Sequence, residues 1–156
     1  MSIDLHNEAK NKMRIIKQEE GDGVTRASLK FFKDHFKELG KVKYVILYYA
    51  EDEWVLNPDL MHQYVIIIGE NCQLWMSGLA WGYYGEGPYG LFEVMQMIDL
   101  KISYEEIVSL GWETDDVYMF ENVNGRLLLK SFNESARSFL CGVDNRLPWE
   151  NRFISS

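Results

Sequence analysis

Hydrophobic residues in the first forty positions recur at the spacing of an amphipathic helix, in two separate stretches. The first stretch places Leu5, Ala9, Met13 and Ile16 on one helical face. A Gly-Asp-Gly break at 21–23 ends it, and a second apolar stripe runs through 29–39. Thr25 is placed to cap this second helix, and Gly40 to end it. The pattern therefore predicts a helical pair over residues 1–40.

The following segment changes to runs rich in β-branched and aromatic residues. The expected strands are 42–49, a weaker run at 54–56, 62–68, 72–77, 117–121 and 126–132. Gly69 to Asn71 form the expected turn of one hairpin, and Asn124-Gly125 is a strong turn signal for a second. These strands predict an antiparallel sheet.

Two further short helices are expected between the hairpins. Apolar residues return to helical spacing over 91–98, after Pro88, whose missing N–H suits the first turn of a helix. Ser103, with Glu106 three residues later, is a capping-box pattern. We expect this last helix to end at Gly111.

The elements predict one α+β domain over 1–156: a helical opening (1–40), an antiparallel sheet of about five or six strands with inserted helices (41–132), and a C-terminal tail (133–156). A length of 156 residues with 47% hydrophobic composition supports one core without a metal or a disulfide. No apolar run approaches the ~20 residues of a membrane span, and the N-terminus lacks a signal-peptide pattern. We therefore expect a soluble cytoplasmic protein in which Cys72 and Cys141 stay reduced.

The formal net charge of −8 argues against nucleic acid and anionic membranes as partners, since both attract clustered cations. The acidity is uneven: residues 1–41 carry a net +2, and the remaining residues carry −10. No Lys or Arg occurs between residues 44 and 100, a stretch that contains eight carboxylates. Three of these carboxylates are consecutive, at Glu51, Asp52 and Glu53. This charge deficit favours a basic partner.

The segment 85–90, Gly-Glu-Gly-Pro-Tyr-Gly, matches the GxGxxG pattern of dinucleotide-binding loops. Those loops aim backbone N–H groups at a pyrophosphate. Here Pro88 removes a donor, Glu86 adds negative charge, and no cation lies nearby in sequence. We therefore interpret the glycines and the proline as structural turn residues, namely Gly82, Gly85, Gly87, Pro88 and Gly90.

The aromatic residues around this turn have two alternative roles. In one, Trp81, Tyr83 and Tyr84 pack on the sheet. In the other, Trp81, Tyr83, Tyr84 and Tyr89 form an exposed platform on a turn made rigid by proline. Large amphipathic rings on a rigid loop give a protein interface contact area at low entropic cost.

One local resemblance covers this corner. The run Trp81-Gly82-Tyr83-Tyr84-Gly85-Glu86-Gly87-Pro88, continuing to Leu91, resembles a W-G-Y-G-G-x-G-P-x-x-L signature of small, poorly characterised bacterial and phage domains. The chain differs from the signature at Tyr84, where a glycine is usual. The resemblance implies a bacterial or mobile-element origin and a similar strand-loop-helix corner, and it implies no activity. In composition the chain also resembles toxin-immunity and anti-defence inhibitors.

We expect a non-catalytic, acidic binding or inhibitor protein that occludes a basic surface of another protein, with no cofactor or metal. The expected partner-binding residues are Glu51, Asp52, Glu53, Trp81, Tyr83, Tyr84, Glu86 and Tyr89. Replacing the acidic triplet with lysines is expected to slow association with the partner.

Two other classes of function remain open. A nucleotide-like ligand could stack on the 85–89 corner if Arg126, Arg137, Arg146 or a helix-borne lysine folds over the loop. A hydrolase could use Asp115 or Asp116 with a histidine. The three histidines, His6, His35 and His62, lie on different expected elements and lack the spacing of a metal site.

Overall fold

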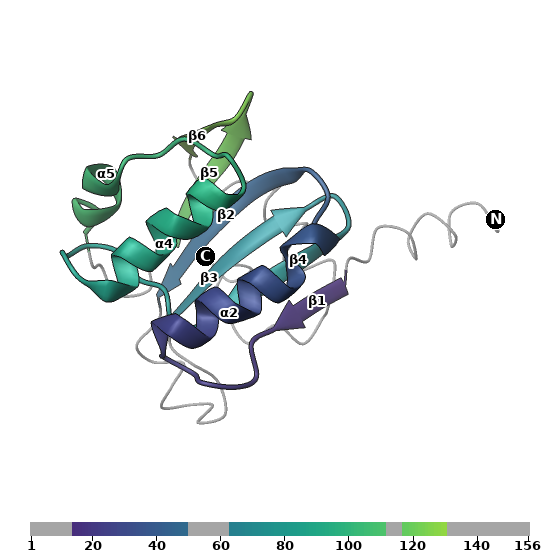
Figure 1. Cartoon of the computed structure of the whole chain (residues 1–156). Helices are drawn as coiled ribbons and strands as arrows, with labels where there is room; N and C mark the ends of the chain where they lie inside the picture. Colours follow the sequence, from purple (N-terminus) through teal and green to yellow (C-terminus); the bar gives the residue numbers. More distant parts are fainter. Residues whose placement is uncertain (1–13, 50–62, 112–116, 131–156) are drawn as a thin grey trace, which may run out of the picture.

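A computed structural model describes residues 14–49, 63–111 and 117–130 of the chain (Figure 1). The strands are β1 (Arg14–Lys17), β2 (Val42–Tyr49), β3 (Gln63–Gly69), β4 (Cys72–Met76), β5 (Val117–Val123) and β6 (Arg126–Lys130). The helices are α2 (Thr25–His35), the 3-10 turn η1 (Phe36–Glu38), α4 (Glu86–Met97) and α5 (Tyr104–Val108). This arrangement confirms the α+β class. The weak strand expected at 54–56 lies outside the described residues.

The six strands form one sheet in the order β1-β4-β3-β2-β5-β6. Four neighbouring pairs are antiparallel, as expected, but β1 runs parallel to β4. The prediction of an antiparallel sheet is therefore wrong at this edge, and the sheet is mixed. The chain passes from β1 to β2 through α2 and η1. Parallel strands of one sheet need such a crossover connection. The antiparallel strands β2, β3 and β4 follow it in sequence.

The expected N-terminal helical pair is not seen among the described residues. The second helix is confirmed as α2, but Arg14–Lys17 form the strand β1. Ile16 pairs with Leu74 of β4 and packs beside the core. The apolar pair Ile15-Ile16 gains a strand partner from the edge of β4, and this tertiary pairing overrides the local helical spacing. Residues 1–13 lie outside the described part of the chain.

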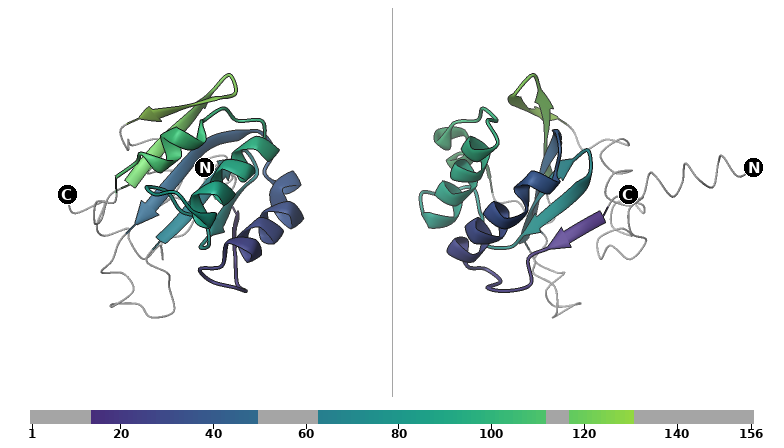
Figure 2. Two further views of the ribbon diagram at one scale, coloured as in Figure 1. Left: turned by 60° about the vertical axis from the view of Figure 1, so that its left-hand side comes forward. Right: turned by 45° about the vertical axis from the view of Figure 1, so that its right-hand side comes forward.

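The helices lie on one face of the sheet (Figure 2). Beneath them is a core of alternate strand residues: Val45, Leu47, Val65, Ile67, Leu74 and Met76. The helices close it with residues such as Phe32, Leu91 and Val94. Side chains that alternate with these residues point to the opposite face, and they are buried too, as Ile46, Ile66 and Trp75 illustrate. The sheet is therefore apolar on both faces at its centre.

Several expected turns and caps are confirmed. Asn124 and Gly125 both have positive φ, 54° and 87°, as a tight hairpin turn requires between β5 and β6. Gly40 follows η1 with φ of 70°. Ser103 and Glu106 form both hydrogen bonds of the capping box. The helix that they open ends at Val108, three residues before the expected stop.

Thr25 is not the cap of α2, in contrast to the prediction. Val24 occupies the N-cap position, and the Thr25 hydroxyl donates a hydrogen bond of 2.7 Å to the carbonyl of Gly78. The side chain of Thr25 is buried against the segment that follows β4. It therefore attaches α2 to the segment that follows β4 instead of satisfying the helix's own N–H groups.

Candidate partner-binding surface

The segment between β4 and α4, residues 77–85, is held from below by a buried polar network. We call it the corner segment. The amide group of Gln18 is central: its Oε1 accepts hydrogen bonds from the Ser28 hydroxyl and from the Ser77 N–H. The Gly78 N–H in turn donates to Ser28 Oγ at 2.8 Å. These bonds join β1, α2 and the corner segment, so the loop starts from a fixed position.

Trp81 is only 1% exposed and belongs to the main core. The prediction that it lies on an exposed platform is therefore wrong, and the alternative in which it packs on the sheet is correct for this residue. Its bulk is accommodated inside because the backbone turns at Gly82, which has φ of 85° and donates its N–H to the carbonyl of Ile107. The same burial anchors the middle of the corner segment.

Three tyrosines around the turn point outward instead. Tyr83, Tyr84 and Tyr89 are 46%, 67% and 48% exposed. The exposed-platform alternative is therefore correct for these three. Two residues outside the predicted set, Phe92 and Tyr104, complete the aromatic group.

Tyr104 lies at the centre of this group. Its ring centroid is 5.8 Å from that of Tyr84 and 5.4 Å from that of Tyr89, both in edge-to-face geometry. Phe92 lies 5.9 Å from Tyr89 and from Tyr104. Such aromatic pairs contribute about 0.5–1.5 kcal/mol each beyond the area they bury. The exposed rings of Tyr84 and Tyr89 are thus supported from behind by a half-buried one.

Carboxylates border these rings. Glu86, Tyr89 and Glu93 lie three and four residues apart on α4, so they share one face of the helix. Glu105 of α5 accepts a hydrogen bond of 2.7 Å from the Tyr84 hydroxyl. This hydrogen bond and the negative charge of Glu105 raise the pKa of Tyr84.

We call this region the tyrosine surface. It comprises Tyr83, Tyr84, Glu86, Tyr89, Phe92, Glu93, Tyr104 and Glu105. The two segments that provide it, 83–93 and 104–105, contain no Lys or Arg. Within the described residues, none of its three carboxylates forms an ion pair. The surface is therefore aromatic, and its negative charges are not paired by any cation in the described part of the chain.

The glycines of the GxGxxG string serve packing. A Cβ on Gly85 would lie 2.7 Å from the Tyr83 ring, and one on Gly87 would lie 2.8 Å from Ala80 Cβ. A Cβ on Gly90 would lie 2.6 Å from the methyl group of Thr25. The Gly85 N–H donates to the Tyr104 hydroxyl at 3.2 Å, so this donor is already engaged. The expectation that these are structural positions agrees with the geometry.

Pro88 lies in the first turn of α4, as expected, and is buried. At this position the helix does not need the N–H that proline lacks. The N-cap of this helix is Gly85, which makes no side-chain cap. Packing of α4 against α2 and the sheet therefore matters more to its start than capping does.

Of the remaining residues singled out in the sequence, some are described by the structure and the others lie outside the described residues. Cys72 is a free, fully buried thiol, and burial raises its pKa, as expected for an inert core cysteine. His35 binds Glu38 on the surface, with Nδ1 2.8 Å from Oε2. Outside the described residues lie Glu51, Asp52, Glu53, Asp115, Asp116, His6, His62, Cys141, Arg137 and Arg146.

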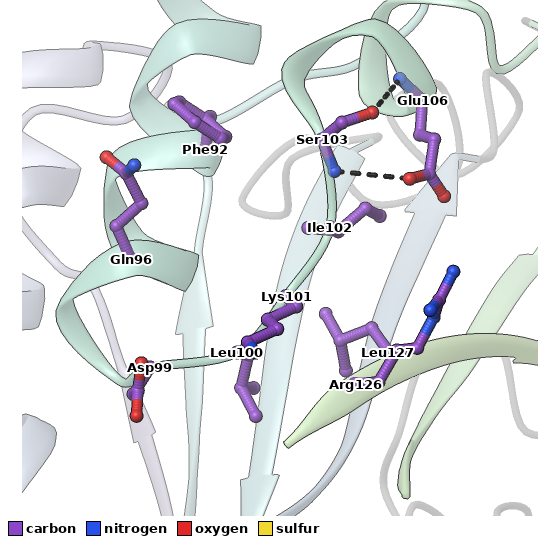
Figure 3. Close-up of a pocket in the computed structure, with 10 residues that line it drawn as sticks. All are labelled: Phe92, Gln96, Asp99, Leu100, Lys101, Ile102, Ser103, Glu106, Arg126 and Leu127. Atoms are coloured by element: carbon purple, nitrogen blue, oxygen red, sulfur yellow. Dashed lines mark hydrogen bonds between the residues drawn. The ribbon is translucent and has the colours of Figure 1, made fainter. Parts of the chain in front are cut away.

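Arg126 is the one arginine named for a nucleotide-binding corner that the structure describes. It lines a different pocket, with Phe92, Lys101, Ser103 and Glu106 among its neighbours, and no residue of the 85–89 corner lines that pocket (Figure 3). Within 14–49, 63–111 and 117–130, no group of three or more His, Cys, Asp or Glu residues is placed to hold a metal ion. None of the helices in these ranges is long and apolar enough to cross a membrane.

Tyr104 and Glu105 were not among the predicted partner-binding residues, because they are distant in sequence from the corner segment. Only the packing of α5 against the corner segment, with the Gly82–Ile107 hydrogen bond, brings them there. The proximity of Phe92 to Tyr89 was predictable from the sequence, since Phe92 follows Tyr89 by three residues on a helix.

The chain matches no protein-family model, no curated protein and no solved structure. Its function is therefore argued from the site alone.

Proposed function

We propose that this protein is a non-catalytic binding protein that covers a basic surface of another protein through its tyrosine surface. The observation that carries the proposal is the group of exposed tyrosines, supported by Tyr104 and bordered by carboxylates that form no ion pair with any other described residue. Aromatic residues are enriched at the centres of protein interfaces, where tyrosine often provides a large share of the binding energy.

The tyrosines are partly fixed before any partner binds. Tyr84 is restrained by its hydrogen bond to Glu105 and by the ring of Tyr104. Tyr89 is restrained by Phe92 and Tyr104. Immobilising a flexible side chain on binding costs about 0.5–1.5 kcal/mol, so rings that are already held lose less. This favours a role in recognition over a role as incidental surface residues.

The carboxylates indicate the kind of partner. Glu86, Glu93 and Glu105 would attract a surface rich in Lys and Arg and would repel an acidic one. Inhibition would follow from steric occlusion of that basic surface, as in toxin-immunity or anti-defence proteins. The resemblance of the corner to bacterial and phage domains supports a bacterial or phage origin for such a pair.

The test is affinity capture with matched charge variants. Wild-type protein, Glu86→Lys/Glu105→Lys and Glu19→Lys/Glu20→Lys are immobilised and exposed to the same bacterial lysate at low and high salt. Both double variants change the net charge equally, but Glu19 and Glu20 are exposed residues outside the tyrosine surface. We expect the wild type and the control to retain the same basic protein, and the tyrosine-surface variant to lose it.

Two further measurements complete the test. The purified partner should bind Tyr89→Ala at least about tenfold more weakly than wild type, since central tyrosines can cost 2 kcal/mol or more when truncated. Association with the wild type should slow as salt increases. If the captured protein is acidic, or if both double variants retain it equally, the proposed surface is wrong.

A further inference from the structure

A second candidate site lies between the end of α4, α5 and β6. Figure 3 shows this pocket, which has a volume of about 530 Å³. That volume lies within the range of small-molecule sites. Phe92, Leu100, Ile102 and Leu127 give it an apolar lining, and Gln96 and Ser103 add polar groups.

Four charged side chains also line the pocket, and their charges balance. Lys101 and Arg126 are cationic, and Asp99 and Glu106 are anionic. Among the described residues, none of the four forms an ion pair with another. Charges of both signs therefore line one pocket without neutralising each other at contact distance.

The backbone fixes the two cations in register. Lys101 forms an isolated parallel bridge with Arg126. The Lys101 N–H donates to the carbonyl of Gly125 at 2.8 Å, and the Leu127 N–H donates to the carbonyl of Lys101 at 3.1 Å. The guanidinium of Arg126 extends from β6 toward α5 in Figure 3. An anionic group in the pocket could thus meet cations from two separate segments.

The carboxylates are placed differently. Glu106 Oε1 accepts the Ser103 N–H at 3.3 Å as part of the capping box, which orients that carboxylate beside the pocket. Asp99 has a positive φ of 55° where the chain leaves α4, and its side chain is exposed. A cationic group of a ligand could be accepted by either carboxylate.

We propose that this pocket binds a small zwitterion with an apolar or aromatic body, such as a free α-amino acid. Its carboxylate would bind Arg126 and Lys101, since an arginine fork matches a carboxylate geometrically. Its ammonium group would face Asp99 or Glu106, and its side chain would lie against Phe92 and Ile102. This site is separate from the protein-binding role proposed for the tyrosine surface, although Phe92 contributes to both.

The experiment is an amide NMR titration of the full chain with L-phenylalanine, L-tryptophan and L-leucine at millimolar concentrations. Comparison probes are 3-phenylpropionate, which lacks the ammonium group, phenethylamine, which lacks the carboxylate, and adenosine monophosphate. We expect saturable shifts confined to the residues that line the pocket, namely 92, 96, 99–103, 106 and 126–127, with at least one amino acid, and at least about tenfold weaker binding of the comparison probes.

Two variants locate the interaction. Arg126→Gln should weaken amino-acid binding at least about tenfold, because it removes a charged hydrogen-bond donor. Lys130→Gln is the control, since Lys130 is an exposed cation on the same strand that does not line the pocket. The proposal is overturned if none of the three amino acids shifts these resonances, if a comparison probe binds as tightly, or if the two variants behave alike.

Discussion

Replacing Gln18 with leucine removes the side chain that joins β1, α2 and the corner segment. Gln18 is 4% exposed, and its side chain makes four hydrogen bonds with other described residues. Its Nε2 donates to the carbonyls of Glu20 and Gly21, each at 3.0 Å. Its Oε1 accepts from the Ser28 hydroxyl at 2.5 Å and from the Ser77 N–H at 3.2 Å. Leucine is similar in size but can form none of these bonds.

The loss of stability in Gln18→Leu depends on which former hydrogen-bond partners of Gln18 can bind water instead. Glu20 and Gly21 are exposed, so their carbonyls can bind water after the substitution. Ser28 is fully buried, Ser77 is 2% exposed, and the Ser77 N–H is left without its acceptor. Each buried polar group left unsatisfied costs about 1–3 kcal/mol. We therefore expect Gln18→Leu to lower the free energy of unfolding by about 3 kcal/mol.

Thermal and urea unfolding of the full chain measure this effect. A loss of about 3 kcal/mol corresponds to a decrease in Tm of about 6–12 °C for a chain of this size. Gln96→Leu is the matched control, because Gln96 is exposed and its side chain forms no hydrogen bond with another described residue. It should change stability by no more than about 0.5 kcal/mol. A loss below about 1 kcal/mol for Gln18→Leu would refute the view that this network fixes the corner.

Two other predictions concern the end of α2 and its contacts. A Cβ on Gly69 would lie 2.2 Å from the carbonyl oxygen of Leu39, so Gly69→Ala should cost about 1–3 kcal/mol in urea unfolding, and a neutral effect would contradict this. Hydrogen bonds with His35 and Arg14 lower the pKa of Glu38 in the folded state, so its stabilising effect is present above the usual carboxyl pKa and is lost as the pH falls below that pKa and through the lowered folded-state pKa. The stability difference between wild type and Glu38→Gln should therefore shrink as pH falls, and a constant difference would argue against the ion pairs.

Local signals predicted the elements whose partners are close in sequence. The β3–β4 and β5–β6 hairpins follow from their turns, and at Asn124 and Gly125 the positive φ values explain why those residue types occur there. The bounds of β2 were also predictable, since Val42–Tyr49 is a long β-rich run ended on one side by Gly40. In each case the residues that end the strand lie within a few positions of it in the sequence.

Prediction failed where a distant partner decides the structure. Ile16 has helical spacing with earlier residues, yet it pairs with Leu74, almost sixty positions away. Thr25 has the chemistry of a cap, yet its hydroxyl donates to the carbonyl of Gly78 in the corner segment. No local pattern encodes either contact. The parallel β1–β4 pair and the true role of Thr25 are consequences of tertiary packing.

The candidate site also combines features that the local sequence predicts with features that depend on distant contacts. The exposure of Tyr83, Tyr84 and Tyr89 was one of two alternatives open from the sequence, and the burial of Trp81 belongs to the other. Tyr104, which comes from a separate helix, packs against the outward rings of Tyr84 and Tyr89. A single loop can therefore place one aromatic residue in the core and present its neighbours to a partner.

The packing around the corner segment explains why the GxGxxG pattern at 85–90 occurs in a segment without cations. In a dinucleotide site the glycines clear space for a ligand's phosphates. Here the space at Gly85 is taken by the Tyr83 ring, and the space at Gly87 and Gly90 by Ala80 and Thr25. The glycines bring α4 close to α2 and to the corner segment, and this close approach holds the exposed tyrosines in place. A bulkier residue at Gly85 would displace Tyr83 and alter the tyrosine surface without touching any ligand.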